Sequence, residues 1–97
     1  MKVRYTKTAL AEIDEICSYI ARDNPKAAAA IAAAIEKTIN RIAERPRPAP
    51  IVYEGQVRAK LVERYQYRIF YAVVGVEPII RNIRSTRRRQ PWERQET

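Results

Sequence analysis

The stretch "LAEIDEICSYIARDNPKAAAAI", residues 10–31, predicts two helices joined by a tight turn. Its first half carries apolar residues at spacings of three, three, one and three, which place them on one face of a helix. These residues are Leu10, Ile13, Ile16, Cys17 and Ile20. In the middle, Asn24 is a favoured helix N-cap and Pro25 a favoured first helical residue, so a second helix begins there.

The second helix is rich in alanine, which has a high helix propensity and lets a neighbouring helix approach closely. Its apolar face is marked by Ile31, Ile35, Ile39 and Ile42. The prolines of "ERPRPAP", residues 44–50, prevent the helix from continuing. We therefore expect a helical hairpin with helices at residues 8–22 and 25–45, in which Thr6 or Thr8 caps the first helix.

On both sides of the hairpin the apolar period changes to two, which is typical of β-strands. Strands are expected at residues 2–6, 56–63, 66–74 and 79–85, with a turn at "GVEP", residues 75–78. The predicted fold class is α+β in the order β-α-α-β-β-β, with an antiparallel sheet and the helical hairpin packed on one face. We expect one domain over residues 1–97, ending in a basic tail from about residue 86.

The charge of the chain points to an anionic partner. The net charge is +8, and the six arginines that follow Ile79 face only Glu93 and Glu96. Nucleic acid or an acidic protein segment fits such a surface, and a membrane surface ranks behind both. The sequence shows neither a signal peptide nor an apolar run of membrane-spanning length, and its single cysteine, Cys17, is expected to be a core residue. We expect a cytoplasmic protein without a membrane partner.

The residue types restrict the available chemistry. The chain has no histidine, and Gly55 and Gly75 are its only glycines, so it has neither the commonest acid–base residue nor a glycine-rich phosphate loop. We expect no cofactor and no metal site. The carboxylates of "EIDE", residues 12–15, are expected to face solvent and basic side chains.

The strand "YRIFYAVV", residues 67–74, predicts a two-sided surface. One face carries Tyr67, Ile69, Tyr71 and Val73, and the other carries Arg68, Phe70, Ala72 and Val74. Arg68 beside Phe70 indicates a partly apolar, cationic groove on the side away from the helices. The alternative, of equal weight, is that Arg68 pairs with Glu54 or Glu63.

Taken in order, these segments resemble the RelE/ParE family of bacterial toxins, also called plasmid stabilisation proteins. The resemblance rests on residues 10–31, on "YRIFY" and on "IRSTRRRQPW", residues 83–92, and covers nearly the whole chain. It implies one of two activities. RelE-like members cut messenger RNA on the ribosome without metal by 2′-hydroxyl attack, and ParE-like members poison DNA gyrase. In both branches an antitoxin with an acidic, partly disordered segment neutralises the toxin.

Within this family the sequence favours a ParE-like gyrase poison, which is not an enzyme. Many relatives carry a histidine where Ser85 stands, and cleavage needs groups that move protons. The expected partners are a ParD-like antitoxin and DNA gyrase. The residues expected to bind the antitoxin or the target are Arg58, Arg68, Arg84, Arg87, Arg88, Arg89 and Trp92.

Two alternatives stay open. The first is a RelE-like, metal-independent endoribonuclease acting on ribosome-bound messenger RNA. Its candidate catalytic residues are Lys60, Tyr65, Arg68 and Arg87, with Tyr67 as a further acid or base. The lysine and the tyrosines have ordinary pKa values of about 10, so each needs a large shift to work at neutral pH. The second alternative is a non-toxic basic module that binds nucleic acid.

Overall fold

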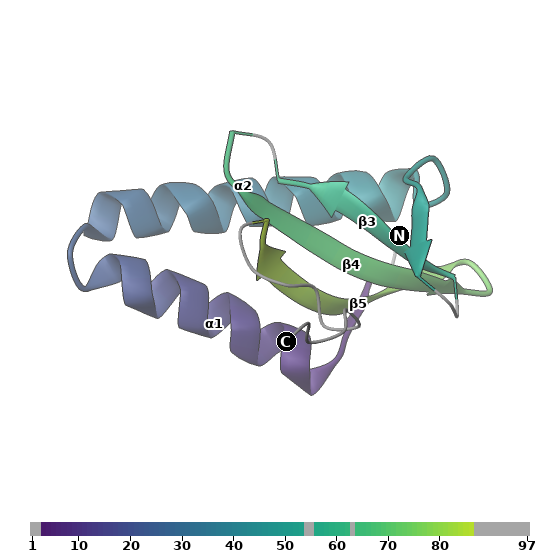
Figure 1. The fold of residues 1–97 in the computed structure, drawn as a ribbon, viewed down its shortest axis with the longest axis horizontal. Coiled ribbons are helices and arrows are strands. Elements are labelled where there is room, and N and C mark those ends of the chain that lie inside the picture. Colours follow the sequence, from purple (N-terminus) through teal and green to yellow (C-terminus); the bar gives the residue numbers. More distant parts are fainter. Residues whose placement is uncertain (1–2, 54–55, 63, 87–97) are drawn as a thin grey trace, which may run out of the picture.

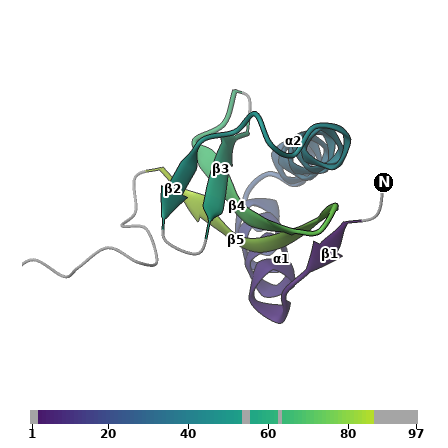
Figure 2. The same ribbon diagram turned by 90° about the vertical axis from the view of Figure 1, so that its right-hand side faces the viewer.

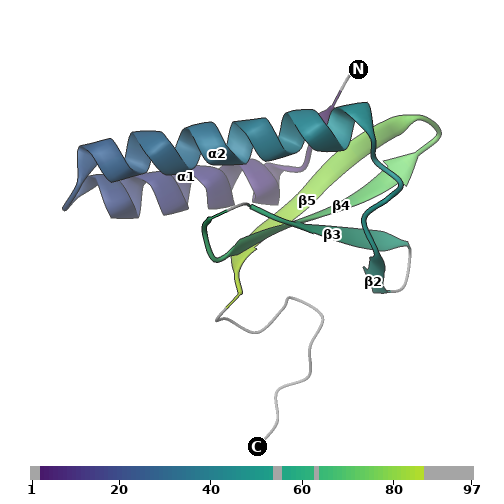
Figure 3. The ribbon, with the colours of Figure 1, turned by 90° about the horizontal axis from the view of Figure 1, so that it is seen from above.

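The computed structural model describes residues 3–53, 56–62 and 64–86 of the chain. They form two helices and five strands in the order β-α-α-β-β-β-β (Figure 1). The elements are β1 (Arg4–Tyr5), α1 (Lys7–Ala21), α2 (Pro25–Glu44), β2 (Ile51–Tyr53), β3 (Val57–Leu61), β4 (Tyr67–Val74) and β5 (Glu77–Ser85). The α+β class and the helical hairpin on one face of the sheet are confirmed (Figure 3).

Both helices carry N-caps that the sequence predicts; α2 begins at Pro25 as expected, and α1 begins at Lys7, one residue before its expected start. The Thr6 hydroxyl accepts a hydrogen bond from the Ala9 N–H, and the Asn24 side chain accepts one from the Ala27 N–H, each at 3.0 Å. Pro25 stands at the first turn of α2, where its missing N–H costs nothing. The expected position of Leu10 on the buried face was wrong. It is 53% exposed, whereas Ala9 is fully buried and completes the stripe with Ile13.

The sheet has the order β1-β5-β4-β3-β2, so β1 and β2 form its two edges (Figure 2). The sheet is not wholly antiparallel, as the sequence suggested, because β1 runs parallel to β5. The helical hairpin and strands β2, β3 and β4 all lie between β1 and β5 in the chain, which gives the long connection that parallel strands need. The edge strand β2 was not predicted. It has three residues, all exposed, so no alternation of apolar and polar side chains marks it.

The core lies between the helical hairpin and the sheet. All four isoleucines of the predicted α2 face are buried, at 4% exposure or less. The sheet contributes Ile69, Tyr71, Ile80 and Ile83 to the same cluster, and Cys17 packs half-buried against it. Phe70 points to the opposite face, where it forms a second small cluster of buried residues with Val57 and Ala59. The predicted division of β4 into two faces is therefore correct.

The β4–β5 connection is tighter than expected. Only Gly75 and Val76 form the turn, and Glu77 and Pro78 already belong to β5. Gly75 has a φ of +65°, while Val76 is not in the positive-φ region. Glycine at the first of two turn residues is the pattern of a type II′ hairpin turn, which matches the twist of the flanking strands.

Candidate functional site

Two arginines lie side by side where β4 and β5 approach the arginine-rich end of the chain. Arg68 and Arg84 are direct cross-strand partners, so both side chains leave the backbone on the side of the sheet away from the helices, and the Arg84 side chain then reaches back to α1. Like charges placed directly opposite one another destabilise a sheet, so the pair has a cost that folding alone does not explain. Arg68 is exposed and has no ion-pair partner among the described residues. Both Glu54 and Glu63, its alternative partners, lie outside those residues.

Glu12 of α1 compensates the charge of Arg84. The Arg84 Nε lies 3.0 Å from Glu12 Oε2, and the two side chains are 31% and 14% exposed. Nε is buried and has no hydrogen-bond acceptor among the described residues, so this contact is an ion pair without hydrogen-bond geometry. The other oxygen, Oε1, accepts hydrogen bonds from the Ile83 N–H at 2.8 Å and the Asn82 amide at 3.4 Å.

These contacts fix an irregular part of β5. The register between β4 and β5 shifts between Phe70 and Tyr71, so that Arg81 falls outside the pairing. The Arg81 carbonyl accepts a hydrogen bond from the Thr6 hydroxyl at 3.0 Å. Thr6 and Glu12 therefore bind the backbone of β5 beyond the end of β1, at an edge that has no neighbouring strand there.

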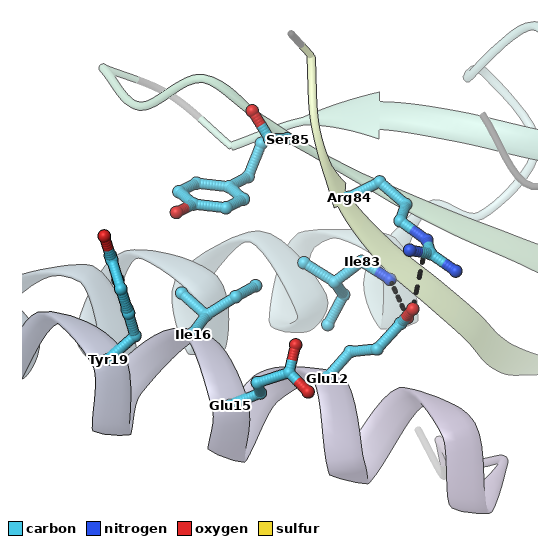
Figure 4. Close-up of a pocket in the computed structure, with 8 residues that line it drawn as sticks. Glu12, Glu15, Ile16, Tyr19, Ile83, Arg84 and Ser85 are labelled. Carbon is cyan, nitrogen blue, oxygen red and sulfur yellow. Dashed lines mark hydrogen bonds and ion pairs between the residues drawn. The ribbon is translucent and has the colours of Figure 1, made fainter. Parts of the chain in front are cut away.

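A small pocket lies between α1 and the end of β5 (Figure 4). Its volume is about 270 Å³, and its lining residues are Glu12, Glu15, Ile16, Tyr19, Tyr67, Ile83, Arg84 and Ser85. Figure 4 shows the α1 side chains on one side and those of β5 on the other. Ligand cavities usually measure roughly 300–1,000 Å³, so this pocket lies at the lower end of that size range. Ser85 and Tyr67 are cross-strand partners within it.

Arg58 has a different setting from the arginine pair. It is the cross-strand partner of Tyr71 and therefore lies on the helix-facing side of the sheet. Its Nη1 donates hydrogen bonds to the carbonyls of Arg47 and Ala49, each at 2.7 Å. The Tyr71 hydroxyl donates to the carbonyl of Pro46. Arg58 thus holds the proline-rich connector between α2 and β2 against the sheet.

The candidate nuclease residues do not meet at one place. Lys60 is paired with Ile69 on the helix-facing side and lines a groove beside α2. Tyr65 follows β3 and lines another groove over the alanines of α2. Arg68 lies on the opposite face of the sheet. Of the other expected site residues, Arg87, Arg88, Arg89 and Trp92 lie outside the described residues.

Three described side chains have a shifted pKa, and each shift moves it further above neutral pH. Burial raises the pKa of the Tyr71 phenol, against the opposing effect of the Arg58 charge. Burial and the nearby Asp14 carboxylate raise the pKa of the Cys17 thiol, which disfavours the reactive thiolate. Burial, helped by Glu36, also raises the pKa of Tyr5.

The role of Glu12 was not predicted from the sequence. This residue was expected to face solvent with the other carboxylates of residues 12–15, but it joins α1 to β5. Its position three residues after Ala9 and four before Ile16 places it at the border of the buried face of the helix. That spacing is the signal that could have separated Glu12 from Glu15.

Solved structures with a similar fold are toxin–antitoxin complexes. One is described as the chromosomal ParDE system of P. aeruginosa, with a TM-score of 0.76 and 20% identity over 88% of this chain and 95% of that chain. Another is the intact E. coli RelBE complex, with a TM-score of 0.62 and 17% identity over 89% and 96%. None of the curated protein sequences matches this chain.

Two helices packed on one face of a mostly antiparallel five-stranded sheet are the fold of RelE/ParE-type toxin structures. Within that class, the model of the family described as "ParE toxin of type II toxin-antitoxin system, parDE" matches residues 3–90. The chain belongs to the ParE toxin family, which makes it a toxin of a type II toxin–antitoxin system. No helix in the described part of the chain is both long and apolar enough to cross a membrane.

Proposed function

We propose that this toxin inhibits DNA gyrase and that an antitoxin with an acidic segment neutralises it. One observation supports this target over messenger RNA. The residues that could move protons, Lys60 and Tyr65, lie on the other side of the sheet from Arg68, which would bind the phosphate. General acid–base catalysis requires the proton donor and acceptor within hydrogen-bond reach of the reacting atoms.

A surface that only binds has no such requirement. A guanidinium group stays charged at neutral pH and binds a carboxylate or phosphate with two parallel hydrogen bonds. Arg68 is exposed beside Leu61, its cross-strand partner, which is itself 53% exposed. Where β3 ends and β4 begins, this face of the sheet therefore offers a cation next to an apolar side chain, a combination suited to a protein partner. An acidic antitoxin segment fits the same surface.

The gyrase proposal can be tested by expressing the toxin without an antitoxin. We expect DNA damage signalling, stalled gyrase–DNA complexes and loss of supercoiling by purified gyrase, while translated messages stay intact. Replacing Arg87, Arg88 and Arg89 together by alanine should abolish toxicity and leave the circular dichroism spectrum unchanged. The exposed Arg22→Ala variant, at the end of α1, is the control for loss of one positive charge and should stay toxic.

The same experiment separates the alternative targets. Codon-positioned cuts in ribosome-bound messages, found by primer extension together with unaffected gyrase supercoiling, would replace the gyrase assignment by RelE-like cleavage. Salt-sensitive binding to any DNA or RNA without growth arrest would favour the basic nucleic-acid-binding module.

A further inference from the structure

A second surface lies at the other end of strands β4 and β5 from the arginine pair (Figure 3). It is an open groove of about 400 Å³ between the connector that follows α2 and the β4–β5 turn. Residues 45–48 form one wall, and Val73, Gly75 and Val76 form the other. We call it the hairpin groove. Of the residues expected to bind the antitoxin or gyrase, the described Arg58, Arg68 and Arg84 do not line it.

The walls of the hairpin groove are held in place before any ligand arrives. Arg58 and Tyr71 together bind the carbonyls of Pro46, Arg47 and Ala49. The Arg47 side chain crosses the groove and donates a hydrogen bond to the Gly75 carbonyl at 3.3 Å. A surface already fixed in its binding conformation loses little entropy when it binds a partner.

The groove combines apolar walls with positive charge. Pro46, Pro48 and Val73 line it, and the neighbouring Val74 and Val76 are 62% and 72% exposed. Arg45 and Arg47 supply two positive charges, and no acidic side chain of the described residues lines the groove. An apolar side chain placed against these exposed valines would remove apolar surface from water, and this favours binding.

We propose that the hairpin groove is a docking site for an acidic protein segment in which carboxylates flank an apolar side chain. The apolar side chain would lie between the prolines and valines, and the carboxylates would pair with Arg45 and Arg47. A second copy of the chain does not fit, because its net charge of +8 would face the same two arginines. Nucleic acid fits less well, since the apolar walls offer nothing to a phosphate backbone.

The test uses the full chain labelled with ¹⁵N and the synthetic peptide Asp-Glu-Trp-Asp-Glu, followed by NMR. We expect saturable shifts of the Arg47, Gly75 and Val76 amides. The peptide Lys-Lys-Trp-Lys-Lys should leave them unchanged. Neither gyrase nor an antitoxin is present, so the result does not depend on the proposed target. Failure of the gyrase proposal would leave this binding intact.

Two pairs of variants separate the apolar and charged contributions. Val76→Ser should weaken peptide binding by about three- to tenfold, whereas Leu10→Ser, at another exposed apolar residue, on α1, should not. Arg45→Gln should weaken it about threefold and reduce its dependence on salt, whereas Arg22→Gln should do neither. Arg22 and Arg45 are matched, because each is the exposed C-cap residue of a helix.

Three outcomes would overturn the proposal. The first is that the acidic peptide shifts amides beside Arg68 and Arg84 and leaves those of the hairpin groove unchanged. The second is that binding to the groove is the same for Val76→Ser as for the unchanged chain. The third is that a short DNA duplex produces the same amide shifts and displaces the peptide, which would identify a nucleic-acid site.

Discussion

A single carboxylate links the first helix of this toxin to its last strand. Glu12 neutralises Arg84 and accepts hydrogen bonds from two neighbouring residues of β5. It therefore holds β5 against α1 at residues 82 and 83 and reduces the net positive charge of the arginine pair. Glu15, one turn further along α1, lines the same pocket but is exposed and makes no ion pair within the described residues.

We predict that Glu12→Gln lowers the free energy of unfolding by about 1–2 kcal/mol, because the amide still accepts the Ile83 hydrogen bond but no longer pairs with Arg84. Glu12→Ala, which removes both contacts, should cost about 2–3 kcal/mol. The matched control Glu15→Gln should stay within about 0.5 kcal/mol of the unchanged chain. Urea unfolding followed by circular dichroism measures all three. Equal stability of Glu12→Gln and Glu15→Gln would show that the Arg84 ion pair is not stabilising.

Residue roles were harder to predict from the sequence than residue positions. Alternation along β3 correctly separates Arg58 from Ala59, but it does not show that the carbonyls of residues 47 and 49 lie within reach of Arg58. Those carbonyls belong to a connector whose path depends on packing between α2 and the sheet. Spacing along α1 could have marked Glu12 as a residue at the border of the buried face, but it could not name its partners on β5, some seventy residues later.

At the scale of elements, local signals decided what could be predicted. Both helices carry caps, a proline or an apolar stripe within a few residues, and both were placed to within one residue at each end. Strand β2 carries none of these signals and exists because its backbone pairs with β3. The parallel pairing of β1 with β5 depends on the tertiary fold, and no local pattern reports it.

The β4–β5 hairpin allows a clean test of backbone conformation. A methyl group added at Gly75 would meet no atom within 4 Å, so Gly75→Ala tests only the cost of placing a side chain at a φ of +65°. We predict a loss of about 1 kcal/mol in the free energy of unfolding. Val76→Ala, at the adjacent turn residue without a positive φ, should change it by less than about 0.5 kcal/mol. If thermal and urea unfolding show the two variants to be equally stable, the turn does not have this conformation.

The whole molecule is a basic body, with a net charge of +8 on 97 residues. It presents cations at both ends of the β4–β5 hairpin, with Arg68 and Arg84 at one end and Arg45 and Arg47 at the other. A long acidic segment could therefore lie along the β4–β5 hairpin and pair with arginines at both of its ends. Such charge complementarity mainly increases the rate of association and the specificity for the partner.

We predict that the toxin, expressed from its own operon, purifies as a stoichiometric complex with an acidic antitoxin. The association rate should fall steeply between about 50 and 500 mM salt, because the Debye length shortens over this range. Stopped-flow mixing of the separated components measures the rate, and size-exclusion chromatography measures the stoichiometry. Recovery of the toxin alone from its operon would count against antitoxin neutralisation.

The pairing of β1 with β5 has a consequence for how the toxin is made. The Thr6–Arg81 contact that extends this pairing joins residues 75 positions apart, and Ile80 and Ile83 complete the core. Contacts that close a loop of that length form late in folding, because the chain must lose conformational entropy before the contacts can stabilise it. A ribosome adds about 5–20 residues per second, so the nascent chain spends about 4–16 s without its last strand. The toxin therefore lacks its complete sheet and core for nearly the whole of its own translation.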